Sequence, residues 1–545
     1  MRIVWLDLNC SYAHSSLALS ALHAQVMHRT DVVWEVVHTT TGESVGTAVD
    51  AIYAHCPDVV AATAWLFTHE HLLHIIARVK ALLPQVVVIL GGPEFLGDNE
   101  RYLHHHPEVD CVLRGEGEES FARWLDVWNH PTAWCDIDGL CYIDKSTHDF
   151  HDNALARVMN FAALHAPEES TLFTWGKPFV QVETTRGCFN TCAFCVSGVG
   201  DPIRMLPLED IRRRLDNIRE RGIRDVRVLD RTFNYHPRHA IELLQLFAEY
   251  HPHLRFHLEI HPALLPQSVR EVLVAMPHGL LHLEAGIQSL RQEVLDASMR
   301  KGRLEQALDG LRFLCSLPNL VTHADLIAGL PYYTLSQIYE DIHTLAAYQA
   351  GEIQLESLKL LPGTVMRRDA EELAIRYSPL PPYEVLETGA ITNHELQEAR
   401  LLSRLLDAYY NTAAWQSITR RLILEEEGFL HHFLCHLIEH NYIDQPMSLE
   451  RRGELLYLFC CDCYPKYVTE VAVAWIEAGM SLKKRPAEGV RTKHVQPAEN
   501  WTVVYGEYTD SMRLCFLPVD EAGHGYWFGY DTTSQCPAPI FRAEG

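Results

Sequence analysis

Residues 183–195 read ETTRGCFNTCAFC, and this stretch carries the clearest chemical motif of the chain. Its three cysteines, Cys188, Cys192 and Cys195, stand four and three residues apart in one loop, with Gly187 beside the first. Thiolates at this spacing can bind three irons of a cubic iron–sulfur cluster and leave the fourth iron open. The alternatives are a zinc knuckle and three unrelated thiols. Structural zinc takes four closed ligands, and no fourth Cys or His stands nearby at knuckle spacing.

The cysteine loop follows the first of six β-rich runs that alternate with helical patterns. Strands that alternate with helices predict βαβ units and a parallel sheet, and a count of six favours a partial (βα)6 barrel of the TIM type. Chemistry in such barrels lies at the carboxyl ends of the strands. The expected strands span residues 179–185, 226–230, 255–260, 281–286, 321–327 and 353–359.

A separate alternating series occupies the first 125 residues or so. It predicts an α/β, doubly wound (Rossmann-like) domain with a parallel sheet covered by helices on both faces. The residues that follow its strands are rich in Gly and small polar groups, as a crevice against a large flat ligand requires. These loops span residues 9–15, 63–67, 91–94 and 114–119.

The length of 545 residues suggests three or four domains. We expect a doubly wound domain over 1–130, a linker over 131–178, the barrel over 179–366, a mostly helical domain over 367–480 and a small β-rich tail over 481–545.

The composition excludes some classes of partner. A net charge of −25 repels phosphate backbones, so nucleic acid is a poor first guess. The N-terminal apolar run is cut by Asp7, which argues against a signal peptide, and the apolar stretch 72–90 is too interrupted to span a membrane. We therefore expect a cytoplasmic protein without a membrane partner.

The C-x3-C-x2-C loop on the first strand of a (βα)6 series resembles that of the radical S-adenosylmethionine (SAM) superfamily. The resemblance implies that Cys188, Cys192 and Cys195 hold a [4Fe–4S] cluster whose open iron binds the amino and carboxylate groups of SAM. Reduction then cleaves SAM to a 5′-deoxyadenosyl radical. Phe194 matches the aromatic position that packs against adenine in this family.

Polar residues at the strand ends are the expected further contacts to SAM. A lone strand-end acid is usually a helix cap or a surface charge, but several in register around one barrel mouth favour a site. The resemblance implies a contact to the methionine amino group near Asp230, and ribose and adenine contacts further round the barrel. The candidates are Asp230, Glu259, Glu284, Gln288 and Asp325.

The first domain resembles the cobalamin-binding domain that precedes the radical barrel in the cobalamin-dependent branch of the superfamily. Segments 358–364, 381–386 and 409–411 extend the likeness to a largely uncharacterised subfamily of cobalamin-binding radical proteins. The Asp-x-His-x-x-Gly pattern of older cobalamin proteins is missing, so we expect cobalamin without His coordination and His14 as an ordinary loop residue. The residues expected near cobalamin are Asn9, Ser11, His14, Thr63, Gly91, Gly92, Pro93, Glu94 and Glu116.

A second thiol group, Cys460, Cys461 and Cys463, lies in an apolar segment. An auxiliary cluster, a metal or a substrate could engage it, but packing thiols are the expectation. The His-rich segments 69–74 and 104–106 are expected to be solvent-facing helical residues rather than a metal site.

The leading hypothesis for function is a cobalamin-dependent radical SAM methyltransferase that methylates an unactivated carbon. In that scheme the deoxyadenosyl radical removes a hydrogen atom and methylcobalamin delivers the methyl group. The alternatives are an oxidative cyclase or rearrangement enzyme that resembles the anaerobic magnesium-protoporphyrin ester cyclase, and a cobalamin or cluster sensor. Methylthiolation of transfer RNA fits less well, because it needs further N-terminal cysteines and a basic end. The expected partners are a small-molecule or peptide substrate and a reductant such as flavodoxin or ferredoxin.

Overall fold

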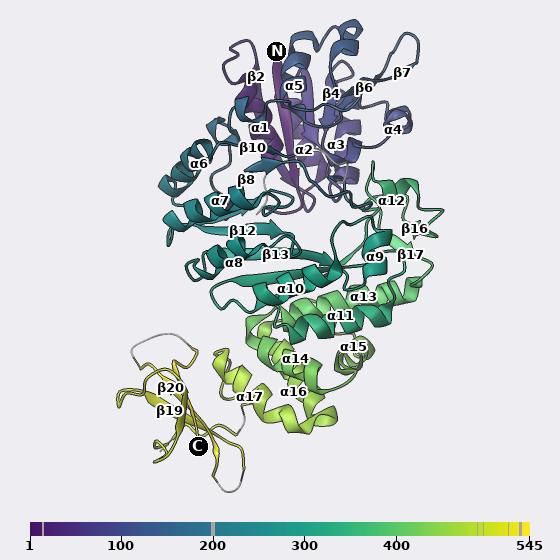
Figure 1. Cartoon of the computed structure of the whole chain (residues 1–545). Helices are drawn as coiled ribbons and strands as arrows, with labels where there is room; N and C mark the ends of the chain where they lie inside the picture. The colour runs from purple at the N-terminus through teal and green to yellow at the C-terminus, as the bar shows by residue number, and fades with distance from the viewer. Residues whose placement is uncertain (13–15, 198–201, 488, 494, 521–522, 533–536) are drawn as a thin grey trace. The chain divides into compact units, whose positions relative to one another are not determined.

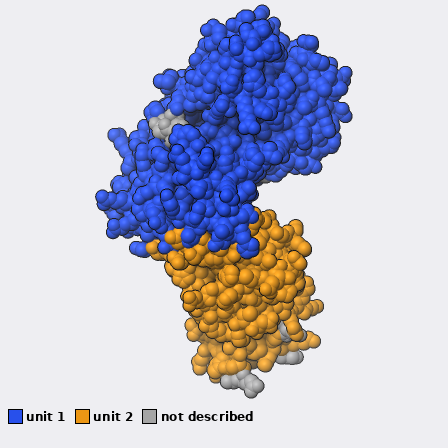
Figure 2. All heavy atoms as spheres, turned by 90° about the vertical axis from the view of Figure 1, so that its right-hand side faces the viewer, with its two compact units in different colours: residues 1–334, 357–396 blue, residues 335–356, 397–545 orange. Residues whose placement is uncertain are grey.

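The structure is a computed structural model that describes residues 1–545 except 13–15, 198–201, 488, 494, 521–522 and 533–536. The chain divides into two compact units, which Figure 2 distinguishes by colour. The first contains Met1–Thr334 and Ser357–Leu396, and the second contains Leu335–Glu356 and Gln397–Gly545. Among the described residues, no helix is long and apolar enough to cross a membrane.

The first unit begins with a seven-stranded sheet (Figure 1). Strands β1 to β5 pair in parallel, and β6 and β7 add an antiparallel edge. In spatial order the strands are β2 (Val33–Thr40), β1 (Arg2–Asn9), β3 (Val59–Thr63), β4 (Val87–Gly91), β5 (Cys111–Leu113), β6 (Leu140–Ile143) and β7 (Phe150–Asp152).

Alternating residues of β1 build two hydrophobic cores, one on each face of this sheet. Ile3 and Trp5 pack on one side with residues of α1 (Leu17–Val26) and α5 (Gly117–Val127). Val4 and Leu6 pack on the other with residues of α2 (Val45–Ala54), α3 (His69–Leu82) and α4 (Glu100–His105). Burial on both faces explains the nearly continuous apolar strands. The predicted doubly wound domain is confirmed.

The strand order of this sheet predicts where a ligand crevice lies. β1 lies between β2 and β3, so the direction in which the sheet grows reverses at the boundary between β1 and β3. Open parallel sheets bind ligands beyond the carboxyl ends of the strands at such a switch point. The loops after β3, β4 and β5 meet at that edge.

The six strands expected for the barrel are all present. β8 (Phe179–Val182), β11 (Asp225–Val228), β12 (Arg255–Ile260), β13 (Leu281–Gln288) and β14 (Val321–Ala328) pair in parallel in chain order. The sixth is β15 (Glu352–Ser357). The connecting helices are α6 (Leu208–Glu220), α7 (Pro237–Glu249), α8 (Gln267–Val274), α9 (Gln292–Ala297), α10 (Leu304–Cys315) and α11 (Leu335–Ala347).

Each barrel strand separates apolar from polar side chains. In β12, Phe256, Leu258 and Ile260 are buried, whereas His257 and Glu259 on the opposite face are only half-buried. β13 repeats the pattern with buried Leu281, Leu283, Ala285 and Ile287. Successive side chains of a strand point to opposite faces, so one face of this sheet is polar and in register across the strands.

The segment after the barrel strands contains α12 (Val365–Arg368), β16 (Arg376–Tyr377) and β17 (Val385–Glu387). The second unit is mostly helical, as predicted for the C-terminal region. Its last part is an antiparallel sheet whose aromatic core contains Phe516, Trp527 and Phe541. Besides α11, its helices are α13 (Asn393–Leu405), which begins in the first unit, α14 (Ala413–Glu425), α15 (Phe429–Glu439), α16 (Leu449–Cys463) and α17 (Val468–Glu477). The strands of its antiparallel sheet, in spatial order, are β18 (Thr502–Tyr505), β21 (Phe541–Glu544), β20 (Gly525–Tyr530) and β19 (Arg513–Pro518).

Candidate functional site

The cysteine loop starts from a short hairpin in which β9 (Thr185–Arg186) pairs with β10 (Arg204–Met205). Gly187 has a φ of 106°, and a Cβ there would lie 2.8 Å from the Pro202 carbonyl oxygen, so the chain requires glycine where it turns into the loop. Cys188 and Cys192 are buried and Cys195 is half-buried.

Burial raises the pKa of Cys192, and the nearby thiols of Cys195 and Cys188 raise it further. Cys188 and Cys195 thus lie close enough to Cys192 to affect its titration. Their convergence in one loop is the arrangement that the sequence predicted.

Two distant segments fix the backbone of this loop. The Ala193 N–H donates to the Ser298 carbonyl at 2.8 Å, and the Ala193 carbonyl accepts from the Met366 N–H at 2.8 Å. The Asn190 side-chain oxygen accepts from the Lys301 N–H at 3.0 Å. The backbone of the loop is therefore fixed by hydrogen bonds from segments outside it.

Asp230 is fully buried just after β11. One carboxylate oxygen accepts from the backbone N–H groups of Thr184 and Thr185 at 2.8 and 2.9 Å, and the other accepts from the Thr184 hydroxyl. These bonds fix the chain just before the cysteine loop. They favour a positioning role for Asp230 over a direct contact to SAM.

The remaining acids predicted at the strand ends meet on the polar face of the barrel sheet. His257 and Glu284 are hydrogen-bonded at 2.8 Å, and the His323 Nε2 lies 2.9 Å from an Asp325 carboxylate oxygen. Glu259 pairs directly with Glu284 in the strand register. The structure therefore brings Glu259, Glu284 and Asp325 together.

The titration of these acids follows from burial and their neighbours. Burial raises the pKa of Glu259 to about 7; Arg231, 3.8 Å away, opposes the shift, and Glu284 and Asp325 add to it. The hydrogen bond from His257 lowers the pKa of Glu284. Burial raises the pKa of Asp325. Carboxyl groups with divergent pKa values in one cluster are typical of functional sites.

Of the two other predicted SAM contacts, Gln288 lies near this cluster and Phe194 lies beside the thiols. Gln288 ends β13 with a φ of 71°, and its side-chain nitrogen would lie 2.6 Å from a Cβ placed on Gly286. Phe194 is half-buried between Cys192 and Cys195.

The sequence reasoning missed Arg300 and the two imidazoles, His257 and His323. Arg300 donates to the Cys192 sulfur at 3.5 Å and also to the Gly286 carbonyl. Nothing in its local sequence marks this role, because Arg300 follows a helix of ordinary composition. The alternation of His257 with Glu259, and of His323 with Asp325, along their strands was a signal that could have identified the imidazoles.

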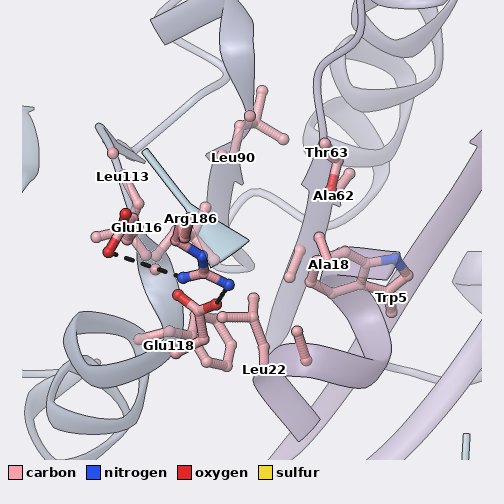
Figure 3. A pocket seen from close by; sticks show the side chains of 18 residues that line it. Trp5, Ala18, Leu22, Ala62, Thr63, Leu90, Leu113, Glu116, Glu118 and Arg186 are labelled. Atoms are coloured by element: carbon pink, nitrogen blue, oxygen red, sulfur yellow. Dashed lines mark ion pairs between the residues drawn. The ribbon is translucent and has the colours of Figure 1, made fainter. Parts of the chain in front are cut away.

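The first sheet carries a pocket of about 250 Å³ at the carboxyl ends of β3, β4 and β5 (Figure 3). Its apolar wall comes from the first sheet and from α1 and α5, and includes Trp5, Leu22, Leu113 and Phe121. Four residues predicted near cobalamin line it, namely Thr63, Gly91, Gly92 and Glu116. The crevice therefore lies at the edge where the strand order requires it.

The other residues predicted near cobalamin have different positions. Asn9 donates to the Asp7 carboxylate at 3.0 Å, and Ser11 is exposed. Pro93 begins a short 3-10 helix, η1 (Pro93–Phe95), in which Glu94 is buried and accepts a hydrogen bond from the Tyr383 hydroxyl. His14 lies outside the described residues.

An ion-pair network connects this pocket with the start of the cysteine loop. Arg186 lines the pocket, donates to Glu183 at 2.6 Å and pairs with Glu118 at 2.9 Å. Arg204 pairs with Glu116 at 2.6 Å. Burial opposes the charge of Arg186, but Glu118 and Glu183 outweigh it, so its pKa is raised.

The second thiol group differs from the cysteine loop. Cys460 is buried in α16, whereas Cys461 and Cys463 are exposed. Burial raises the pKa of Cys460 to about 12, which makes its thiolate unfavourable. The expectation of packing thiols therefore holds for Cys460 and is wrong for Cys461 and Cys463, which are exposed.

Comparison with protein families identifies three regions. The Radical SAM superfamily model matches residues 182–345, and the B12 binding domain model matches residues 9–125. A protein of unknown function (DUF4080) model matches residues 371–472.

Curated relatives include the cobalamin-dependent radical SAM methyltransferase TokK of Streptomyces tokunonensis, 25% identical over 60% of this chain and 51% of the relative. The hopanoid C-3 methylase of Methylococcus capsulatus is 23% identical over 48% of this chain and 51% of the relative. The chain thus spans about half the length of these relatives.

Two solved structures show the same fold. The cobalamin-dependent SAM radical enzyme OxsB, with aqua-cobalamin and SAM bound, has a TM-score of 0.61 at 13% identity and covers 88% of this chain and 81% of its own. The methyltransferase TsrM of Kitasatospora setae has a TM-score of 0.57 at 17% identity, with 70% and 80% covered. The chain therefore carries a B12-binding domain over residues 9–125 and a radical SAM domain over residues 182–345.

Proposed function

We propose that this protein is a cobalamin-dependent radical SAM methyltransferase that acts on an unactivated carbon of a small-molecule or peptide substrate. One observation carries the proposal. Arg186 lines the pocket of the B12-binding domain, and the next two residues, Gly187 and Cys188, begin the cysteine loop. The candidate sites for the two cofactors are thus continuous through the backbone.

The cysteine loop fits a [4Fe–4S] cluster. Three thiols converge from one loop whose backbone is fixed by Ser298, Lys301 and Met366, and a fourth protein ligand is not required when SAM occupies the open iron. Cys188, Cys192 and Cys195 would hold the cluster. The cluster and SAM together supply a carbon-centred radical that can remove a hydrogen atom from an unactivated carbon.

The pocket fits part of a cobalamin. Gly92 has a φ of 111°, and a Cβ there would lie 2.8 Å from the Ala64 carbonyl oxygen and from Thr63 Cγ2. The backbone thus passes close to the crevice without a side chain to fill it. Thr63, Gly91, Gly92 and Glu116 would contact the cofactor, and the apolar wall would exclude water from it. Bound cobalamin supplies a methyl group for transfer.

The polar face of the barrel fits SAM. Glu259, Glu284, Gln288 and Asp325 offer acceptors and donors for amino, hydroxyl and ring-nitrogen groups. The pKa of Glu259 near 7 means that this carboxyl can hold or give up a proton close to neutrality. Phe194, beside two of the thiols, would pack against the adenine.

The names of the relatives favour methyl transfer over cyclisation. TokK and the hopanoid C-3 methylase are both named for methyl transfer. The radical chemistry also needs an electron donor, and we propose flavodoxin or ferredoxin.

The test is product analysis with SAM labelled in its methyl group, in protein reconstituted anaerobically with iron, sulfide and hydroxocobalamin and supplied with reduced flavodoxin and candidate substrates. A methyltransferase yields labelled product together with 5′-deoxyadenosine and S-adenosylhomocysteine. 5′-Deoxyadenosine with an unlabelled, cyclised or rearranged product would support the alternative chemistry and contradict methyl transfer.

A further inference from the structure

The pocket of the B12-binding domain has a charged wall that cofactor binding alone does not require. Figure 3 shows the Arg186 side chain beside Glu116 and Glu118, with its ion pairs to both drawn as dashed lines. The guanidinium also lies over the Phe161 ring, 4.5 Å from its centroid. Only 16% of the Arg186 side chain is exposed.

The two strongest partners of Arg186 come from different parts of the first unit. Glu118 lies in the first turn of α5, which packs on the first sheet, and is 9% exposed. Glu183 follows β8 of the barrel and accepts two hydrogen bonds from Arg186, at 2.6 and 3.2 Å. One guanidinium therefore connects the B12-binding domain with the strand that leads into the cysteine loop.

Glu116 depends less on Arg186. Its carboxylate accepts two hydrogen bonds from Arg204, at 2.8 and 2.6 Å, and one from the Val158 N–H at 2.7 Å. Its distance to Arg186 is longer, at 3.7 Å. Loss of Arg186 would therefore affect mainly the Glu118 and Glu183 contacts.

Resting on the proposed function, we propose that Arg186 is a positioning residue that couples occupancy of the cobalamin pocket to the stability of the cluster in the cysteine loop. A ligand in the pocket displaces water from the guanidinium. Lower local polarity strengthens the attraction of Arg186 to Glu118 and Glu183. Because Gly187 and Cys188 follow directly, the stronger pairs hold the start of the loop more firmly.

Coupling of this kind acts in both directions. If cobalamin raises the equilibrium affinity for the cluster by some factor, the cluster must raise the affinity for cobalamin by the same factor. An ion pair with a purely structural role would change the stability of both sites without linking them. The informative quantity is therefore the ratio of the rate of cluster loss without cobalamin to the rate with cobalamin.

Arg214 provides a matched control. It forms a buried ion pair with Glu168 at 2.8 Å and also donates to the Glu183 carbonyl at 3.1 Å. The side chains of Arg214 and Glu168 are 6% and 2% exposed, but neither residue lines the pocket. Arg214→Gln removes a comparable buried charge and a bond to the Glu183 backbone, but it keeps the pairs of Arg186 with the Glu118 and Glu183 carboxylates.

The experiment measures how fast a ferrous-iron chelator strips the cluster from reconstituted full-length protein, with and without saturating hydroxocobalamin. In wild type we expect cobalamin to slow cluster loss by about fivefold or more, the lower end of usual coupling between sites. Arg186→Gln should bring the ratio close to one, and Arg186→Lys should give an intermediate ratio, because an ammonium lacks the planar fork that serves two carboxylates. Arg214→Gln should keep the wild-type ratio even if both rates rise.

The outcomes separate this inference from the proposed function. The coupling is overturned if Arg186→Gln keeps the wild-type ratio. It is also overturned if cobalamin has no effect on cluster loss in wild-type protein that holds both cofactors. Either result leaves the proposed function intact. Failure of wild type to retain cobalamin or the cluster overturns the proposed function itself. If Arg186→Gln does not accumulate as folded protein, Arg186→Lys decides, and a wild-type ratio in that variant overturns the coupling.

Discussion

The guanidinium of Arg300 donates a hydrogen bond to the Cys192 sulfur over 3.5 Å, although 108 positions of the sequence separate the two residues. Arg300 also donates to the Gly286 carbonyl of β13. It thus connects a buried thiol of the cysteine loop with the polar face of the barrel sheet. Its positive charge lowers the pKa of Cys192 against the larger effect of burial, which raises it.

Arg300→Gln should therefore raise the pKa of Cys192 in the cluster-free protein. Less thiolate would be present at neutral pH, so alkylation of Cys192 and assembly of the cluster should both slow. The measurement is the pH dependence of iodoacetamide labelling at Cys192, read by mass spectrometry. Lys301→Gln is the neighbouring control, since Lys301 donates from an exposed amine to the Phe189 carbonyl. Equal labelling profiles in wild type and Arg300→Gln would refute the electrostatic role.

Cys192→Ala should abolish cluster assembly and the cleavage of SAM, because two thiols cannot hold three irons. Iron and sulfide content after reconstitution and the yield of 5′-deoxyadenosine measure the two effects. Cys461→Ala, which changes an exposed thiol of α16, should leave both near wild type. Retention of near-normal deoxyadenosine production in Cys192→Ala would overturn the radical assignment.

Gly92→Ala should weaken cobalamin retention and lower the stability of the protein. A φ of 111° is strained for any residue with a Cβ, and that atom would lie 2.8 Å from the Ala64 carbonyl oxygen. The cost of such strain is about 1–3 kcal/mol. Cobalt content after desalting and the midpoint of thermal unfolding measure the two effects.

Gly176→Ala is the matched control for Gly92→Ala. Gly176 belongs to the same unit, and a Cβ there would have no atom within 4 Å. The control should retain cobalamin, while Gly92→Ala should keep its cluster. Unchanged cobalamin binding in Gly92→Ala would mean that the crevice is placed wrongly.

Glu259→Gln should change how stability depends on pH. Burial raises the pKa of Glu259 to about 7, so the carboxyl is neutral in the folded protein and ionised in the unfolded chain between its ordinary value and about 7. Its contribution to stability is therefore complete below its ordinary pKa and is lost as pH rises towards 7. The unfolding temperature of Glu259→Gln minus that of wild type should therefore increase from pH 5 to about pH 8.

The control for the pH effect is Glu284→Gln. A hydrogen bond from His257 lowers the pKa of Glu284, so its contribution is present above the ordinary value and is lost in acid. The two variants should thus depart from wild type at opposite ends of the pH range. A constant difference between Glu259→Gln and wild type across pH 5–8 would contradict the assignment.

Much of the fold could be predicted from local patterns. The apolar runs of the first sheet and the alternating βα series of the barrel are set by short-range periodicity, and the observed barrel strands β8 and β11 to β15 match the predicted runs closely. The cysteine loop could be predicted as well, because its spacing lies within eight residues.

Residues that meet only through tertiary packing could not be predicted in the same way. Arg300 contacts Cys192, and Tyr383 contacts Glu94, across 108 and 289 positions of sequence. Asp230 was expected at the SAM site from its place after a strand. Its carboxylate instead accepts hydrogen bonds from Thr184 and Thr185, a use that strand position alone does not reveal.

We propose that one chain holds both cofactors, and the cobalt content of the reconstituted protein tests this claim. The protein is reconstituted anaerobically with iron and sulfide, incubated with hydroxocobalamin, desalted, and assayed for cobalt, iron and sulfide per chain. We expect near-stoichiometric cobalt together with an intact [4Fe–4S] cluster. A chain that keeps its cluster but retains no cobalt would contradict the claim, and the methyltransferase proposal would fall with it.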